Sequence, residues 1–63
     1  MLIKLYETPD IKIELREKII NDNFHEYTIR ITGKNIKEEK IKYYNKGEAI
    51  ENYYKIIGEI DNK

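Results

Sequence analysis

The chain has 63 residues, of which 12 are basic and 12 are acidic, so its formal net charge is zero. This length allows one domain, residues 1–63, with one small core. The absence of cysteine excludes disulfides, thiolate nucleophiles and cysteine-bound zinc, and the balanced charge argues against generic attraction to nucleic acid or an anionic membrane.

The sequence shows no sign of membrane targeting. The first charge, at Lys4, comes too early for a signal peptide, and no apolar run approaches the roughly 20 residues needed to cross a bilayer. We therefore expect a cytoplasmic protein with no membrane contact. The frequent use of Ile, Lys, Asn and Tyr indicates an AT-rich genome.

The first strand is expected from residue 3 to residue 6, where apolar and polar residues alternate. In this strand Ile3 and Leu5 point one way, and Lys4 and Tyr6 point the other. The cluster at residues 7–10 contains Pro9 and breaks the run.

Residues 11–20 can be read as a strand or as a helix. On a helical wheel, Ile13 and Ile20 fall opposite Ile11, Leu15 and Ile19. A strand places Ile11, Ile13, Leu15 and Ile19 on one side, so the pattern favours a strand.

Two further strands follow turns at residues 21–23 and 33–35. The first carries Tyr27, Ile29 and Ile31 on one face, and the second carries Ile41 and Tyr43 on one face.

The expected strand pairing buries one continuous set of odd-numbered residues. A three-residue loop at 7–9 pairs Leu5 with Ile11, and a three-residue loop at 21–23 pairs Leu15 with Ile29. A tight turn at Gly33 would put the last strand out of phase, so a bulge near residues 38–40 or a longer loop is expected there.

The last element is an amphipathic helix over residues 45–60. Asn45 can cap its free amides, and Glu48 can reach back to the Asn45 amide. Its expected apolar face is made of Ile50, Tyr53, Tyr54, Ile57 and Ile60, with Ala49 and Ile56 at the margins. The predicted fold is α+β: a four-stranded antiparallel β-meander with one C-terminal α-helix packed on one face.

The sequence contains little material for catalysis. It has one histidine and neither serine nor cysteine, so we expect no enzyme activity, no metal and no cofactor. His25 could act as a base or ligand with Asp22 or Glu26, but a half-exposed residue at a strand end is the favoured interpretation.

The sheet face turned away from the helix is the candidate binding surface. It is expected to be basic, with Lys4 and Lys18 among its cations, and its aromatic residues suit contact with an acidic protein or with bases. The alternative is that these long side chains only solubilise the sheet. The predicted partner-binding residues are Tyr6, Lys12, Arg16, Arg30, Lys40, Lys42 and Tyr44.

The second half of the chain resembles a known type of DNA-binding domain. The pattern of residues 27–31, 33–34, 44–45, 48–49 and 53–54 resembles the sheet-plus-helix domains of phage-type integrases and the related AP2-like domains. That resemblance implies a sheet that enters the major groove, and it places the following residues at the nucleic acid: Arg16, Thr28, Arg30, Lys40 and Lys42. This chain has an additional leading strand.

Three functions are therefore expected, in order. The first is a non-enzymatic protein-binding module, such as a regulator or inhibitor of the anti-defence type carried by a phage or mobile element. The second is a nucleic-acid-binding domain that uses the same face. The third is a homodimer or other homo-oligomer formed through exposed apolar residues or an edge strand.

Overall fold

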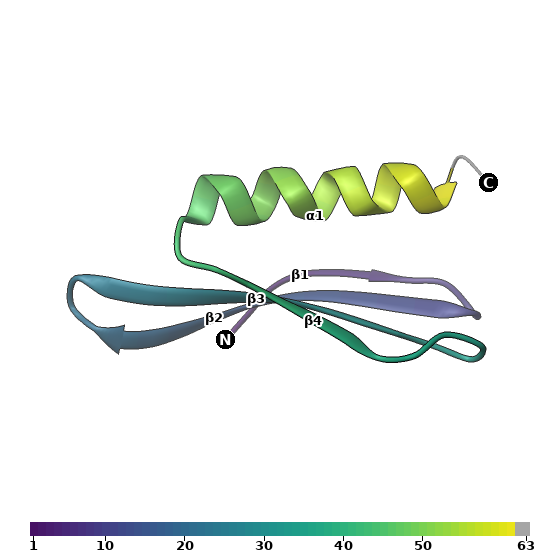
Figure 1. Ribbon diagram of the computed structural model, residues 1–63, viewed down its shortest axis with the longest axis horizontal. Helices are drawn as coiled ribbons and strands as arrows, with labels where there is room; N and C mark the ends of the chain where they lie inside the picture. The colour runs from purple at the N-terminus through teal and green to yellow at the C-terminus, as the bar shows by residue number, and fades with distance from the viewer. Residues whose placement is uncertain (62–63) are drawn as a thin grey trace.

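A computed structural model describes residues 1–61 of the chain. The strands form one antiparallel sheet in the order β1-β2-β3-β4, and the helix lies along one face of it (Figure 1). The elements are β1 (Leu2–Glu7), β2 (Ile11–Asn21), β3 (Phe24–Gly33), β4 (Glu39–Tyr43) and α1 (Lys46–Asp61). The predicted α+β fold is confirmed, and residues 11–20 belong to a strand.

The core lies between α1 and the two central strands. Ile13 and Leu15 of β2 and Ile29 of β3 are completely buried, and Ala49 and Tyr53 of α1 close over them. Burial of an aliphatic side chain of this size contributes about 1.5–3 kcal/mol. Because this helix is short enough to be marginal in isolation, most of its stability comes from this contact.

One half of the predicted cap is present at the start of α1, and the reciprocal hydrogen bond from the Asn45 amide to the Glu48 side chain is not formed among residues 1–61. The Asn45 side-chain oxygen accepts a hydrogen bond from the Glu48 amide at 3.0 Å, an interaction typically worth about 1 kcal/mol. The predicted apolar face is wrong in one place, because Tyr54 is 55% exposed. The buried line runs instead through Ala49 and Tyr53, four residues apart, so Tyr54 lies about 100° around the helix from Tyr53.

The predicted pairing of β2 with β3 is confirmed along most of its length, with Ile13 opposite Ile31 and Leu15 opposite Ile29. The turn itself is shorter than predicted. Asn21 pairs with Phe24, and the register shifts near Ile20. The Asn21 side chain accepts a hydrogen bond from the Asn23 amide at 2.9 Å, which favours this tighter turn.

The predicted pairing of β1 with β2 is wrong. Leu5 lies opposite Glu14 instead of Ile11, and Tyr6 lies opposite Ile13. Because side chains alternate between faces, this change turns Lys4 and Tyr6 toward the helix and Leu5 away from it.

The turn between β1 and β2 explains the difference. The Thr8 amide donates to the Ile11 carbonyl at 2.8 Å, so these two residues pair and Pro9 and Asp10 form the turn. The Thr8 hydroxyl also accepts a hydrogen bond from the Ile11 amide at 3.1 Å. A bulge between Leu2 and Lys4 then shifts the register again, and the intervening residue, Ile3, packs against the core.

The last strand keeps the expected phase. Ile41 lies opposite Ile29 and Tyr43 lies opposite Tyr27. The sequence left open a bulge near residues 38–40 or a longer loop. The structure has the longer loop, over residues 34–38 between β3 and β4.

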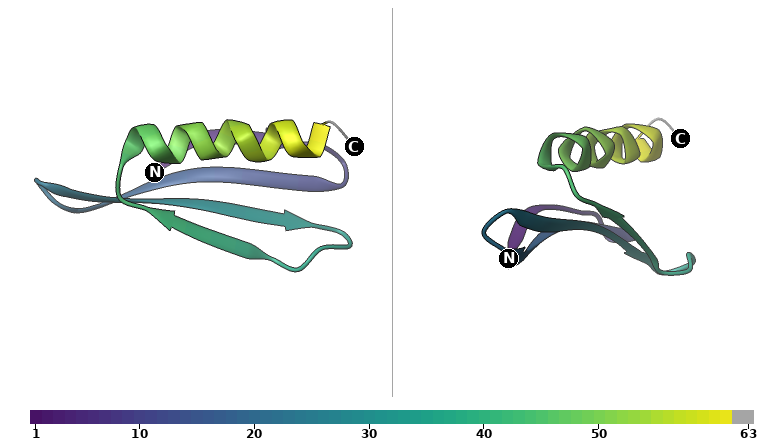
Figure 2. Two further views of the ribbon diagram at one scale, coloured as in Figure 1. Left: turned by 45° about the horizontal axis from the view of Figure 1, so that its top comes forward. Right: turned by 60° about the vertical axis from the view of Figure 1, so that its left-hand side comes forward.

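The molecule is elongated, with extents of 39 × 18 × 16 Å. The end of the β2–β3 hairpin projects beyond the start of α1, and the helix covers the remainder of the sheet on one side only (Figure 2). The opposite side of the sheet is not covered by any element of the described chain.

Gly33 offers a test of the packing where two turns meet. A Cβ atom at this position would lie 2.8 Å from the Asp10 carbonyl oxygen and 2.9 Å from Ile36 Cγ1. We expect Gly33→Ala to lower the free energy of unfolding by about 1–3 kcal/mol, as measured by urea denaturation. Gly58→Ala is the matched control: nothing lies within 4 Å of its added methyl group, and alanine in a helix should stabilise by about 0.5–1 kcal/mol. Equal stability of Gly33→Ala and the parent chain would contradict this packing.

Candidate partner-binding surface

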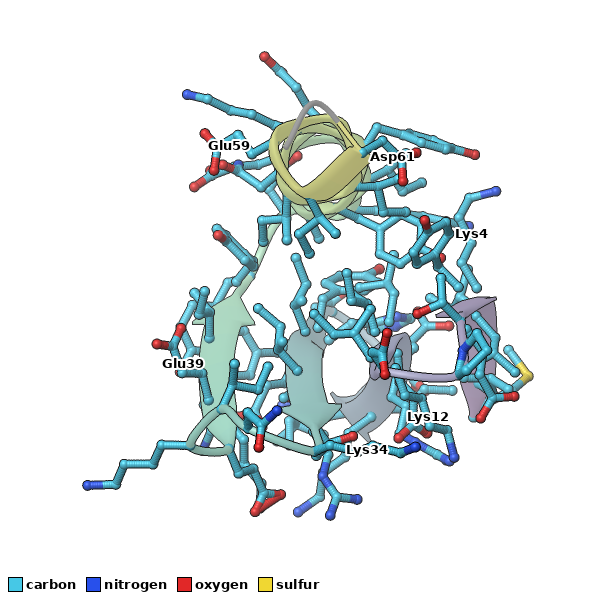
Figure 3. All side chains as sticks on the ribbon, turned by 90° about the vertical axis from the view of Figure 1, so that its right-hand side faces the viewer. Lys4, Lys12, Lys34, Glu39, Glu59 and Asp61 are labelled. Carbon is cyan, nitrogen blue, oxygen red and sulfur yellow. The ribbon has the colours of Figure 1, made fainter. Side chains whose placement is uncertain are left out.

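The open face is defined here as the side of the sheet turned away from α1. In Figure 3 the side chain of Lys12 lies on this side, whereas Lys4 lies beside the helix. The cross-strand register places a series of polar residues on the open face, and alternation excludes them from the core. They are Lys12, Glu14, Arg16, Lys18, Glu26, Thr28, Arg30, Lys40 and Lys42.

The predicted site residues are brought together on this face with one exception. The register places the five predicted cations on the open face: Lys12, Arg16, Arg30, Lys40 and Lys42. Tyr44 lies at one end of it, stacked on Phe24. Tyr6 does not belong to the surface, and neither does Lys4, because the β1 pairing turns both toward the helix.

Tyr6 and Lys4 instead connect the edge strand to α1. The Tyr6 hydroxyl donates a hydrogen bond to Asp61 Oδ1 at 2.5 Å, and this bond raises the pKa of Tyr6. Lys4 Nζ lies 5.4 Å from the centre of the Tyr54 ring, a cation–π geometry. These residues therefore hold the helix in place and do not contribute to the open face.

Glu14 is the one buried charged residue of the open face, with 4% of its surface exposed. Its Oε2 accepts hydrogen bonds from Arg16 Nε at 3.0 Å and from Arg16 Nη2 at 2.7 Å. Lys12 Nζ lies 4.0 Å from Oε1. The Arg16 hydrogen bonds hold the pKa of Glu14 below its usual value, although burial opposes this shift.

The other cations of the face are paired unequally. Arg30 Nε lies 2.6 Å from Glu38 Oε1, and Lys42 Nζ lies 3.7 Å from Glu26 Oε1. Lys40 has no ion pair with any residue in the range 1–61, and it lies directly opposite Arg30. Like charges in opposed positions are unfavourable, so the field around Lys40 favours an external carboxylate or phosphate.

These side chains surround a groove on the open face with a volume of about 650 Å³. Apolar and charged groups share its wall, which is suited to a partner that offers both kinds of contact. The lining includes Met1, Arg16, Ile19, Thr28, Arg30, Lys40 and Lys42.

Part of the surface was not predicted from the sequence. Phe24 stacks on Tyr44 with a centroid distance of 5.2 Å and an interplanar angle of 13°, and both rings are about half exposed. Phe24 has an even number, as do the open-face residues of β3, so strand alternation predicts it on this face. Its ring can reach Tyr44, which is a diagonal neighbour across the β3–β4 pair. Leu5 also lies on this face, as a result of the β1 register.

His25 takes no part in the open face. Its Nδ1 lies 2.7 Å from Glu17 Oε2 on the helix side of the projecting hairpin, and neither Asp22 nor Glu26 is its partner. The hydrogen bond with His25, followed by one with Tyr27, lowers the pKa of Glu17. In the range 1–61 no three His, Asp or Glu side chains are grouped so that they could hold a metal ion.

No family model, curated protein or solved structure matches the chain. Within residues 1–61, no helix combines the length and apolar character needed to cross a membrane.

The ion pairs of the buried Glu14 carboxylate predict a specific pH dependence. Its pKa is lower in the folded chain than the ordinary value of 4.5, so its contribution to stability is present above 4.5 and is lost as the pH falls through the folded value. We expect Glu14→Gln to lower the thermal midpoint near about pH 7, and the difference from the parent chain to shrink toward about pH 3. Circular dichroism melts across this range measure the effect.

Glu51→Gln is the control for this measurement, because Glu51 is exposed on α1 and makes no ion pair in the described chain. Its difference from the parent chain should be small at every pH. A Glu14→Gln difference that stays constant with pH would show that the Glu14 charge does not contribute to stability.

Proposed function

We propose that this chain is a small protein-binding module that captures a partner protein on the open face. The observation that carries the proposal is the uncovered face itself, where a groove of about 650 Å³ combines cations with apolar side chains. Surfaces that combine Arg with apolar side chains are typical of protein interfaces.

The internal ion pairs favour a protein over a phosphate backbone as the partner. Glu14, Glu26 and Glu38 already pair with four of the cations of the face. A phosphate backbone must compete with these carboxylates. A protein can use the remaining charges at Lys18 and Lys40, together with the exposed Phe24 and Tyr44.

The proposal assigns binding and not catalysis to this surface, because its polar groups are cations and their paired carboxylates, without an arranged nucleophile and base. A regulator or inhibitor that acts in the cytoplasm, of the kind carried by phages or other mobile elements, is the class that this proposal favours. Its AT-rich residue usage supports that class.

Lys40→Glu tests the proposal with the least disturbance to the fold, because Lys40 has no ion pair to lose among residues 1–61. A partner is first isolated on the immobilised parent chain from cells of its native host and identified by mass spectrometry. We expect Lys40→Glu to lower the affinity of the chain for the purified partner by about tenfold, as measured by calorimetry.

The matched control is Lys55→Glu, which reverses an exposed lysine on α1 and should leave the affinity unchanged. A partner that binds Lys40→Glu normally but loses affinity for Lys55→Glu would move the site to the outer side of the helix and contradict the proposal.

A second candidate is nucleic-acid binding by the same face. The order β2-β3-β4-α1, with Thr28, Arg30 and Lys42 on the side opposite the helix, is the arrangement that the resemblance to integrase-type domains implies. This candidate predicts an affinity that falls steeply with salt, with a slope of about −0.9 for each phosphate contact on duplex DNA. Fluorescence anisotropy with mixed DNA and RNA probes measures this slope. An absence of binding at low ionic strength would remove this candidate.

A further inference from the structure

A second groove, on the helix side of the sheet, opens between α1 and the edge strand β4. Its volume is about 910 Å³, within the range of natural ligand sites. Most of its lining is isoleucine, contributed by three strands, the 34–38 loop and the helix. These residues are Ile11, Ile31, Ile36, Ile41, Ile56 and Ile60.

The isoleucines of this groove are only partly covered. Ile36 is 46% exposed, and Ile41, Ile56 and Ile60 are half-buried. Glu59 of α1 and Glu39 of β4 lie on the same side of the molecule, one above the other (Figure 3). Together with Lys37 of the 34–38 loop they form a charged rim around an apolar interior at the β4 side. Further apolar side chains could be buried favourably in this interior.

β4 is also one of the two edges of the sheet, and the edges differ. It pairs only with β3, so the backbone groups on its outer side have no strand partner within residues 1–61. At the other edge, β1 carries a bulge between Leu2 and Lys4, a feature that interrupts pairing with an added strand. The pairing of β4 with β3 is regular throughout, so β4 is the edge that can accept another strand.

The side chains of β4 specify what such a strand must carry. Lys40 and Lys42 point to the open face, and Ile41 points to the helix side with Glu39. Residues opposite the two lysines should therefore be acidic, and the residue between them should be apolar and enter the isoleucine-lined groove. A basic residue is complementary opposite Glu39.

We propose that the partner adds an acidic strand to β4, in which carboxylates alternate with apolar residues that enter the groove between α1 and β4. This inference rests on the proposed protein-binding function and names the chemistry of the partner segment. Main-chain hydrogen bonds to the β4 edge supply affinity, and the alternating side chains supply specificity.

A second copy of the chain fits the same edge poorly. Antiparallel pairing of two β4 strands about Ile41 places Lys40 of each copy opposite Lys42 of the other. These two like-charged pairs are unfavourable, and lysine on an edge strand is a common means of preventing self-association. The chemistry of β4 therefore selects a different, acidic strand.

The probe is a synthetic peptide, acetyl-Thr-Val-Glu-Ile-Glu-Lys-Thr-amide. In antiparallel pairing its residues from Val to Lys lie opposite Tyr43, Lys42, Ile41, Lys40 and Glu39. The matched control peptide exchanges the charges: acetyl-Thr-Val-Lys-Ile-Lys-Glu-Thr-amide. We expect NMR titration of the full chain to show amide shifts along β4 and in α1 near Ile56 with the acidic peptide only.

Two kinds of variant test the arrangement. The double variant Lys40→Glu with Lys42→Glu should bind the acidic peptide with about tenfold lower affinity, and it should bind the charge-exchanged peptide. Two N-methylated peptides are compared, one methylated at the amides that point toward β4 and one at the amides that point away from it. The first should not bind, because methylation removes its main-chain hydrogen bonds to β4. No binding of the acidic peptide, or shifts centred on β1 or the open-face groove, would overturn the inference.

Ile36→Glu separates this inference from the proposed function. Ile36 lies in an exposed loop at the groove. Its replacement should lower the affinity for the acidic peptide and leave the fold intact, as judged by the NMR spectrum of the variant. The Ile36→Glu variant could lose the acidic peptide and still capture the natural partner in a way that depends on Lys40. That result would overturn strand addition to β4 but not the open-face function. Capture that does not depend on Lys40, with normal peptide binding at β4, would instead overturn the open-face function.

Discussion

The structure depends on one contact, the burial of Ala49 and Tyr53 of α1 against Ile13, Leu15 and Ile29 of the central strands. The helix is marginal in water alone, and a sheet with one apolar face is not stable without a cover. Each element therefore supplies what the other lacks. Because residues 1–61 contain one helix for this purpose, one face of the sheet is committed to the core and the other is not covered by any element of the described chain.

This contact also explains why the central part of the fold can be predicted from the sequence. In β2 and β3 the apolar residues alternate over a long stretch, and a register that failed to align Leu15 with Ile29 would bring polar residues into the core. The start of α1 is predictable for a local reason, because the Asn45 side chain can satisfy a free helix amide without any tertiary contact. The open-face positions of Arg16, Arg30 and Lys42 follow from the same alternation.

The edge strand β1 could not be placed in this way, because its register depends on the turn and not on its own pattern. Thr8 pairs with Ile11 and shortens the loop by one residue, which is enough to exchange the faces of Leu5 and Tyr6. A strand this short has too few apolar residues to oppose that change, and the Tyr6 bond to Asp61 compensates with a polar link to the helix. Contacts such as the stacking of Phe24 on Tyr44 depend on three-dimensional proximity and have only a weak signal in the sequence.

The bulge in β1 has a consequence for how the protein behaves at high concentration. Growth of a fibril by strand addition requires two receptive edges on every subunit, so that each new molecule offers a place for the next. A subunit with one interrupted edge terminates such a chain as soon as its other edge is occupied. Association through β4 is therefore limited to closed complexes of defined size, even when the protein is abundant.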